Sequence, residues 1–243
     1  MSSAISSEAR DRLLEQLDSC PATYPHIPEA VLSHAREVVS RDLPCSLVRS
    51  LSEQSAGTLQ ALDSLFQKAG AILGLSSEQL VGAAEWNPAD FDPNRFDAMD
   101  AELRTVVWLS QEGFANIRLL RSQGQKKADV TAEKGQTKYA VEVACVTGWK
   151  PPGHVQRSQD LPRFLLDKYD EKKSQLDATA AHHGCQSRVL VCVFVGLDQT
   201  AMITRGEYLE EGLKPAWSRL GAPLDTHLAI IAHPSDNCVF PLW

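Results

Sequence analysis

The sequence lacks any long apolar run: no stretch approaches the roughly 18 consecutive apolar residues that a membrane-spanning helix needs. Its first residues have neither the basic start nor the apolar stretch of a signal peptide. We therefore expect no membrane association and a cytoplasmic location. The 6 cysteines form no C-x-x-C pair, which favours reduced, buried thiols over a disulfide framework or a zinc site.

Two common enzyme signatures are also missing. No G-x-S-x-G elbow occurs, which argues against an α/β-hydrolase nucleophile. Gly70 and Gly74 lack the strand and the spacing of a dinucleotide-binding loop. His182 and His183 stand before Gly184 and are explained by the favourable position of histidines at a helix end.

Charge is distributed unevenly along the chain. The formal net charge of −7 by itself argues against a nucleic-acid partner. Residues 1–100 contain 7 basic and 15 acidic side chains, whereas residues 115–175 contain 12 basic and 7 acidic ones. The later basic excess suits contact with a polyanion, and the acidic first part favours a protein partner or dimerisation.

The first ninety residues show the apolar spacing of helices. The pattern predicts helices over 7–17, 27–39 and about 46–73, the last broken near Gly57, and a capping serine at Ser76 opens a further short helix. Two prolines and several turn-forming residues follow in the segment 86–97. We therefore predict a helical N-terminal module at 1–90 and a second domain at 91–243.

The second domain combines helical and strand patterns. Helices are predicted over 98–112, 160–183 and 205–220, and strands over 114–121, 127–132, 138–146, 188–195 and 227–232. This order predicts a mixed β-sheet with helices packed on it, an α/β or α+β fold. The closing segment 237–243 is apolar and is expected to pack on the sheet or on a second subunit.

Two carboxylates are predicted to face one another on a hairpin. A two-residue turn at Gly135-Gln136 has glycine where a type II′ turn requires it. That turn pairs residues whose numbers sum to 271 and places Asp129 opposite Glu142. Two like charges there destabilise the sheet unless something neutralises them. A divalent cation is one explanation; a pair of solvated carboxylates on an exposed hairpin is the other.

The order of these residues resembles the PD-(D/E)XK nuclease superfamily, which includes restriction endonucleases and Holliday-junction resolvases. In that family a helix with a glutamate precedes a hairpin with an aspartate, a (D/E)XK tripeptide follows, and the next helix carries Lys or Gln. The counterparts here are Glu102, Asp129, the tripeptide Glu142-Val143-Ala144 and the helical segment 168–176. The resemblance covers about residues 98–196. It implies a restriction-endonuclease-like fold and metal-dependent hydrolysis of phosphodiester bonds, with DNA favoured over RNA.

Position 144 departs from the family pattern, because Ala144 stands where the family has a lysine. Either another residue supplies the ammonium group or the site is inactive. The hairpin register places Lys127 across from Ala144 and on the same strand face as Asp129. We therefore predict that Lys127 replaces the missing lysine, although it is also typical of an exposed edge strand. The second choices lie on the following helix: Lys168, Lys172 and Gln175.

The resemblance also implies a set of ligands. Asp129, Glu142 and the main-chain carbonyl of Val143 would hold Mg²⁺ or Mn²⁺, with Glu102 bound through water. The other explanation for Glu102 is the attraction of a helix N-terminus for carboxylates. Contacts with the nucleic-acid backbone are predicted for Arg118, Arg121, Lys150, Arg157, Arg163 and Lys168.

A second hypothesis belongs to a different functional class. In it, the chain has a nuclease fold, has lost catalysis and acts as a nucleic-acid-binding or assembly subunit. Ala144 favours this hypothesis, because the family lysine stabilises negative charge on the phosphate.

Overall fold

The structure is a computed structural model that describes residues 6–43, 46–121, 127–147, 160–195, 204–232 and 237–243. The chain divides into two compact units, Met1–Leu103 and Arg104–Trp243. The division falls inside one helix, α5 (Pro93–Gln111), whereas the sequence places the boundary after residue 90. The prolines and turn residues of the segment 86–97 mark the start of α5, and the compact units separate further along that helix.

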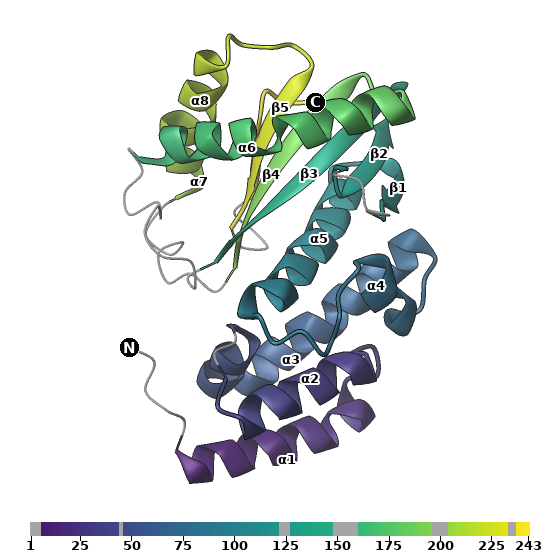
Figure 1. Cartoon of the computed structure of the whole chain (residues 1–243), viewed down its shortest axis with the longest axis vertical. Helices are drawn as coiled ribbons and strands as arrows, with labels where there is room; N and C mark the ends of the chain where they lie inside the picture. The colour runs from purple at the N-terminus through teal and green to yellow at the C-terminus, as the bar shows by residue number, and fades with distance from the viewer. Residues whose placement is uncertain (1–5, 44–45, 122–126, 148–159, 196–203, 233–236) are drawn as a thin grey trace. The chain divides into compact units, whose positions relative to one another are not determined.

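The first unit is built from helices, as the apolar spacing predicts (Figure 1). They are α1 (Ser7–Thr23), α2 (Glu29–Ser40), α3 (Ser46–Leu73), α4 (Ser77–Ala83) and the first part of α5. The predicted capping serine is confirmed: Ser76 and Gln79 form a capping box at the start of α4. The unit's core contains side chains such as Leu17, Val31 and Phe66, each at most 1% exposed.

Helix α3 continues through Gly57, so the predicted break there is wrong. Leu51, Leu59, Leu62 and Phe66 are buried along α3 on both sides of the glycine. Burial of this apolar stripe stabilises the helix by more than the roughly 1 kcal/mol that an interior glycine costs.

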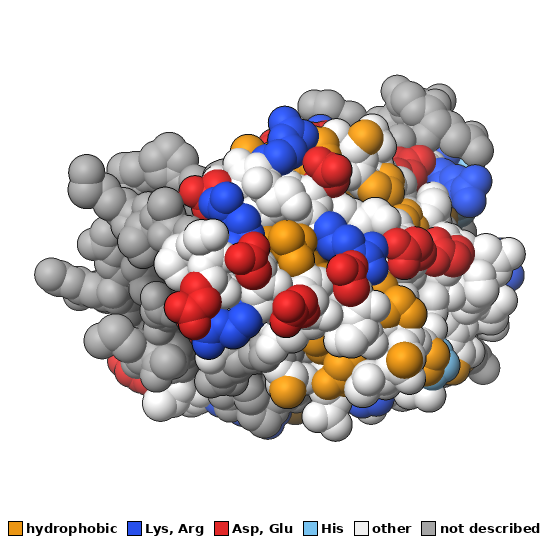
Figure 2. Space-filling view, turned by 90° about the horizontal axis from the view of Figure 1, so that it is seen from below, with side chains coloured by type: hydrophobic (Ala, Val, Ile, Leu, Met, Phe, Trp, Pro, Cys, Tyr) orange, Lys and Arg blue, Asp and Glu red, His pale blue; other side chains and the backbone are white. Residues whose placement is uncertain are grey.

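The surface of the first unit carries both signs of charge. Figure 2 shows acidic and basic side chains interspersed on the face beside α1. Arg36 contacts Asp18 at 2.8 Å and Glu29 at 2.7 Å, and Arg12 contacts Glu8 at 3.2 Å. A face of this kind lacks the excess of positive charge that phosphate binding requires.

Six strands of the described residues form one mixed sheet in the order β1-β2-β3-β4-β5-β6 (Figure 1). They are β1 (Ala115–Leu119), β2 (Val130–Lys134), β3 (Thr137–Thr147), β4 (Ser187–Val195), β5 (Thr226–Ile231) and β6 (Cys238–Phe240). β1, β2 and β3 are antiparallel, β3, β4 and β5 are parallel, and β6 returns antiparallel to β5. The mixed α+β architecture is therefore confirmed, and the apolar closing segment supplies a strand.

Helix α6 (Leu161–His183) crosses one face of this sheet and ends before Gly184, as predicted (Figure 1). Alternation along β3 places Ala140 and Ala144 in one apolar cluster with Leu165 and Leu176 of α6. The single helix predicted over 205–220 is instead divided into α7 (Arg205–Glu207), a π-helix η3 (Tyr208–Leu213) and α8 (Lys214–Arg219).

The opposite face of the sheet is closed by aromatic side chains. The ring of Trp243 lies 4.8 Å from that of Phe114 and 5.7 Å from that of Tyr139, measured between centroids. Its indole N–H donates to the carboxylate of Glu112 at 2.9 Å. Lys134 donates to the main-chain carbonyl of Glu112 at 2.7 Å and lies over the Trp243 ring. The closing segment thus packs on the sheet of its own chain.

The cysteines of the described residues are free thiols. Cys20, Cys192 and Cys238 are buried, and burial raises the pKa of Cys192 to about 12. Among the helices of the described ranges, none is long and apolar enough to cross a membrane.

Candidate metal centre

The hairpin between β2 and β3 has the predicted turn and register. Gly135 has a φ of +60°, whereas the φ of Gln136 is not positive. A type II′ turn requires this combination. The recorded pairs run from Lys134–Thr137 to Val130–Val141, and the numbers of each pair sum to 271 as predicted. One further step along this register would bring Asp129 opposite Glu142, but the pairing ends at Val130–Val141.

The ladder between β2 and β3 ends after Val130 because side chains take the next N–H groups. The N–H of Val143 donates to Oδ2 of Asp129 at 2.7 Å, and the N–H of Ala128 donates to Oγ1 of Thr179 at 2.7 Å. In a continued antiparallel ladder, residues 128 and 143 would bond to each other instead. The strand predicted from residue 127 therefore begins at Val130, and the Asp129 side chain is fixed at the hairpin's end.

Glu142 lies on the sheet face that α6 covers and is only 1% exposed. Its Oε1 accepts from Nζ of Lys172 at 2.7 Å. Its Oε2 is buried and has no hydrogen-bond partner among the described residues. Burial and the neighbouring charge of Asp129 raise the pKa of Glu142 to about 8, against the opposing effect of Lys172. With a pKa of about 8, the metal-free carboxyl group of Glu142 keeps its proton at neutral pH. A divalent cation at Oε2 would replace that proton and compensate the buried negative charge.

Helix α6 presents three polar side chains to this end of the hairpin. Lys172, Gln175 and Thr179 follow at spacings of three and four, which places them on one side of the helix. Gln175 donates to the main-chain carbonyl of Lys127 at 3.3 Å. Burial, the largest single influence, lowers the pKa of Lys172, but the charge and hydrogen bond of Glu142 together with the charges of Asp129 and Glu171 give a net upward change. The ammonium of Lys172 is therefore charged beside Glu142.

Lys127 lies ahead of β2, where its carbonyl is held by α6. The pairing of β2 with β3 stops at Val130, so the predicted pairing of Lys127 with Ala144 is not found in the described strands. Burial is the main cause that lowers the pKa of His183, and the charges of His182, Lys138 and Lys127 lower it further. A catalytic role for Lys127 stays a prediction.

Two further positions of the predicted site are Ala144 and Glu102, which have different surroundings. Ala144 is 5% exposed and packs in the apolar cluster beneath α6. Glu102 is half-buried on the part of α5 that belongs to the first compact unit. The water-mediated role that the resemblance implies for Glu102 stays a prediction.

The predicted phosphate contacts are partly described. Arg118 on β1 and Arg121 just beyond it are exposed. Arg163 is exposed and lies 3.9 Å from Asp167, and Lys168 contacts Glu171 at 2.7 Å. Lys150 and Arg157 lie outside the described residues.

The donor set fits a hard divalent cation better than a closed metal cage. Within the described ranges, no group of three or more His, Cys, Asp and Glu side chains could hold a metal ion. Mg²⁺ needs no such group, because it binds through one or two carboxylates together with water and phosphate oxygens. Asp129 and Glu142 supply two carboxylates. The carbonyl of Val143 points to the same side of β3 as its N–H, toward Asp129.

Thr179 is the residue of this site that sequence reasoning missed. Its spacing of four from Gln175 and seven from Lys172 is the signal that identifies it once α6 is placed against the hairpin. On sequence alone, a threonine inside a helix has no distinguishing mark.

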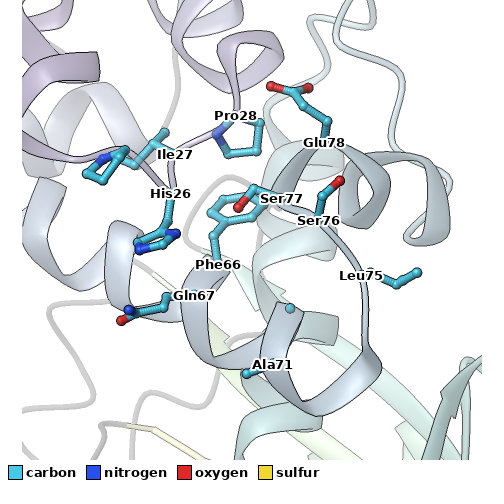
Figure 3. Close-up of a pocket in the computed structure, with 12 residues that line it drawn as sticks. His26, Ile27, Pro28, Phe66, Gln67, Ala71, Leu75, Ser76, Ser77 and Glu78 are labelled. Carbon is cyan, nitrogen blue, oxygen red and sulfur yellow. The ribbon is translucent and has the colours of Figure 1, made fainter.

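A pocket of about 410 Å³ in the first unit is a separate feature. Figure 3 shows the ring of Phe66 between the loop with Ile27 and Pro28 and the turn with Ser76 and Ser77. The sequence-predicted site residues do not line it.

Comparisons of the chain with protein-family models, curated proteins and solved structures gave no match. The family resemblance therefore rests on the order of the elements and on the residues of the hairpin and α6.

Proposed function

We propose that this protein is a metal-dependent nuclease that hydrolyses phosphodiester bonds, with DNA favoured as the substrate. One observation carries the proposal: the buried Glu142 has Lys172 on one oxygen and no partner among the described residues on the other, next to Asp129. Paired carboxylates for a hard cation, with an ammonium beside them, are the groups that metal-assisted phosphodiester hydrolysis uses.

The order of the elements supports the same proposal. A helix, three antiparallel strands, a second helix and a parallel strand follow one another as α5, β1 to β3, α6 and β4. This is the order of the PD-(D/E)XK pattern, with Asp129 and Glu142 on the hairpin and Lys172 and Gln175 on the following helix. A restriction-endonuclease-like fold is therefore part of the proposal.

In the proposed site, Asp129, Glu142 and the carbonyl of Val143 would hold Mg²⁺ or Mn²⁺. The bound ion would supply Lewis acidity and a water of lowered pKa. The N–H of Val143 donates to Oδ2 of Asp129 at 2.7 Å, and this hydrogen bond restricts the rotation of the Asp129 carboxylate. Glu142 in turn holds the Lys172 ammonium, which stabilises negative charge as it develops on the phosphate oxygens.

We assign the role of the missing family lysine to Lys172 rather than Lys127. Nζ of Lys172 lies 2.7 Å from Oε1 of Glu142, whereas Lys127 is fixed to α6 through its carbonyl. Lys127 remains the alternative. The exposed Arg118 and Arg121 are the described candidates for contacts with the substrate backbone.

One observation favours the second function, a nuclease-fold protein that binds nucleic acid or assembles with a partner without catalysis. Position 144 is apolar and packed under α6, so it supplies no charge to the site. In that case the Lys172–Glu142 pair would be a structural ion pair. A protein partner for the acidic first unit is compatible with either function.

The test is incubation of the full chain with single- and double-stranded DNA and RNA, with and without Mg²⁺ or Mn²⁺. We expect metal-dependent cleavage and a metal-induced rise in melting temperature, and Glu142→Ala should abolish both. Asp170→Ala is the matched control, because Asp170 is an exposed carboxylate on α6. Absence of both cleavage and the metal shift would contradict the proposal. Metal binding without cleavage of any substrate would favour the second function.

A further inference from the structure

Thr179 has an unusual position for a helical threonine. Its side chain is fully buried, and its hydroxyl oxygen accepts the N–H of Ala128, 51 residues earlier in the chain, at 2.7 Å. A buried N–H needs an acceptor, and β3 would ordinarily provide it. Thr179 therefore replaces an acceptor of the sheet.

The replaced acceptor is the carbonyl of Val143. In a hairpin closed by a two-residue turn, Lys134–Thr137 and every second pair after it, down to Val130–Val141, exchange both hydrogen bonds. Residues 128 and 143 would be the next such pair. Instead, Thr179 takes the N–H of residue 128, and Asp129 takes the N–H of residue 143. The Ala128 N–H, which would otherwise donate to the Val143 carbonyl, thus donates to Thr179 on α6. The Val143 carbonyl still points from β3 toward Asp129.

We propose that Thr179 is a positioning residue of the metal centre: by holding the Ala128 N–H on α6, it keeps the Val143 carbonyl available as a ligand beside Asp129 and Glu142. This inference rests on the proposed function, because it concerns the same ion. Thr179 itself does not touch the ion. Gln175 supports the arrangement by holding the carbonyl of Lys127, one residue before Ala128.

Two substitutions separate the hydroxyl from the volume of the side chain. Thr179→Val keeps the branched shape but removes the acceptor, so the Ala128 N–H returns to the Val143 carbonyl or loses its partner. Thr179→Ser keeps the acceptor. Thr226→Val is the matched control, because Thr226 is a buried threonine on β5, two strands away from β3.

The experiment is calorimetric titration of each full-length protein with Mn²⁺, alongside its metal-free melting temperature. We expect Thr179→Val to weaken Mn²⁺ binding by about tenfold or more, the usual size of an effect transmitted through a ligand's neighbour. Thr179→Ser and Thr226→Val should bind as the wild type does. If Thr179 had only a structural role, both valine variants would have a lower metal-free melting temperature, and Thr179→Val would bind Mn²⁺ as tightly as Thr226→Val does.

Wild-type binding that Glu142→Ala abolishes but Thr179→Val leaves unchanged would overturn the inference and leave the proposed function standing. Failure of the wild type to bind Mn²⁺ would overturn both. The wild type alone provides a second measurement that needs no folded variant. Saturating Mg²⁺ should shift the ¹³C carbonyl resonance of Val143, and an unmoved resonance would overturn the inference.

Discussion

The ammonium of Lys172 on α6 lies 2.7 Å from the buried Oε1 of Glu142 on β3. Lys172 is part of a helix and Glu142 is part of the sheet, so this ion pair joins the two layers of the second unit at the end of the hairpin. Lys172 places a positive charge beside Glu142, which Ala144 cannot do. This charge comes from the helix, whereas a lysine at position 144 would come from the same strand as Glu142.

Lys172→Met should lower metal-dependent cleavage by about 100-fold or more, because among the described residues it removes the one basic side chain that forms an ion pair with Glu142. Single-turnover cleavage at saturating metal measures the effect. Lys173→Met is the control, since Lys173 is the adjacent exposed lysine of α6. A larger loss in Lys127→Ala than in Lys172→Met would return the role to Lys127.

The stability of the metal-free protein should depend on pH through Glu142. Its folded pKa of about 8 lies above its ordinary value of 4.5. Between these values the folded state binds more protons than the unfolded state, so the free energy of unfolding falls as pH rises. Glu142→Gln should remove about 1 kcal/mol or more of this fall between pH 5 and pH 8.

Urea unfolding with a chelator present measures this pH dependence. Burial lowers the pKa of His183 and of His227, which acts in the opposite direction at the acidic end of the range. Because both proteins contain these histidines, the difference between the pH dependence of the wild type and that of Glu142→Gln removes their contribution. Identical slopes for the wild type and Glu142→Gln would mean that Glu142 ionises at its ordinary pKa.

Trp243→Ala should destabilise the second unit by about 2 to 4 kcal/mol, because the indole packs on Phe114 and Tyr139 and donates to Glu112. The change in urea midpoint measures it. Leu242→Ala is the neighbouring control, since Leu242 is 78% exposed. Equal effects of the two substitutions would show that the aromatic packing contributes nothing specific.

Two glycines of the first unit should respond to alanine with opposite signs. Neither would bring a Cβ within 4 Å of another atom, but Gly74 has a φ of +67° and Gly57 lies inside α3. Gly57→Ala should stabilise by about 0.5 to 1 kcal/mol. Gly74→Ala should destabilise by about 1 kcal/mol, because L-residues are strained in the left-handed region. Thermal unfolding of both variants gives the signs directly, and equal signs would contradict the assigned conformations.

Much of the architecture follows from local patterns. The turn at Gly135-Gln136 sets the register of the hairpin, and apolar spacing with a final glycine sets α6. These features are encoded within short stretches, so the sequence predicts them. The division of 205–220 by a π-helix is different, because it accompanies the close packing of Gly212 against Leu161, which no local pattern reveals.

The hairpin register on which the carboxylate pair was predicted is confirmed as far as Val130–Val141, and Asp129 and Glu142 come one step beyond it. The contacts that surround these two residues could not be predicted from the sequence. The prediction that the strand begins at residue 127 is wrong because Gln175 and Thr179, about fifty residues later, draw residues 127 and 128 onto α6. The local rule therefore fails at the candidate functional site, where tertiary contacts commonly override strand pairing.

The same helix that carries Lys172, Gln175 and Thr179 also contributes Leu165, Tyr169, Leu176 and Ala180 to the apolar core. A rotation or slip of α6 that moved the polar groups off the hairpin would expose this core surface to water. Assembly of the site is thus thermodynamically coupled to the global unfolding of the second unit. Amide exchange at Ala128 and Val143 should accordingly require opening events as costly as those of the central strands.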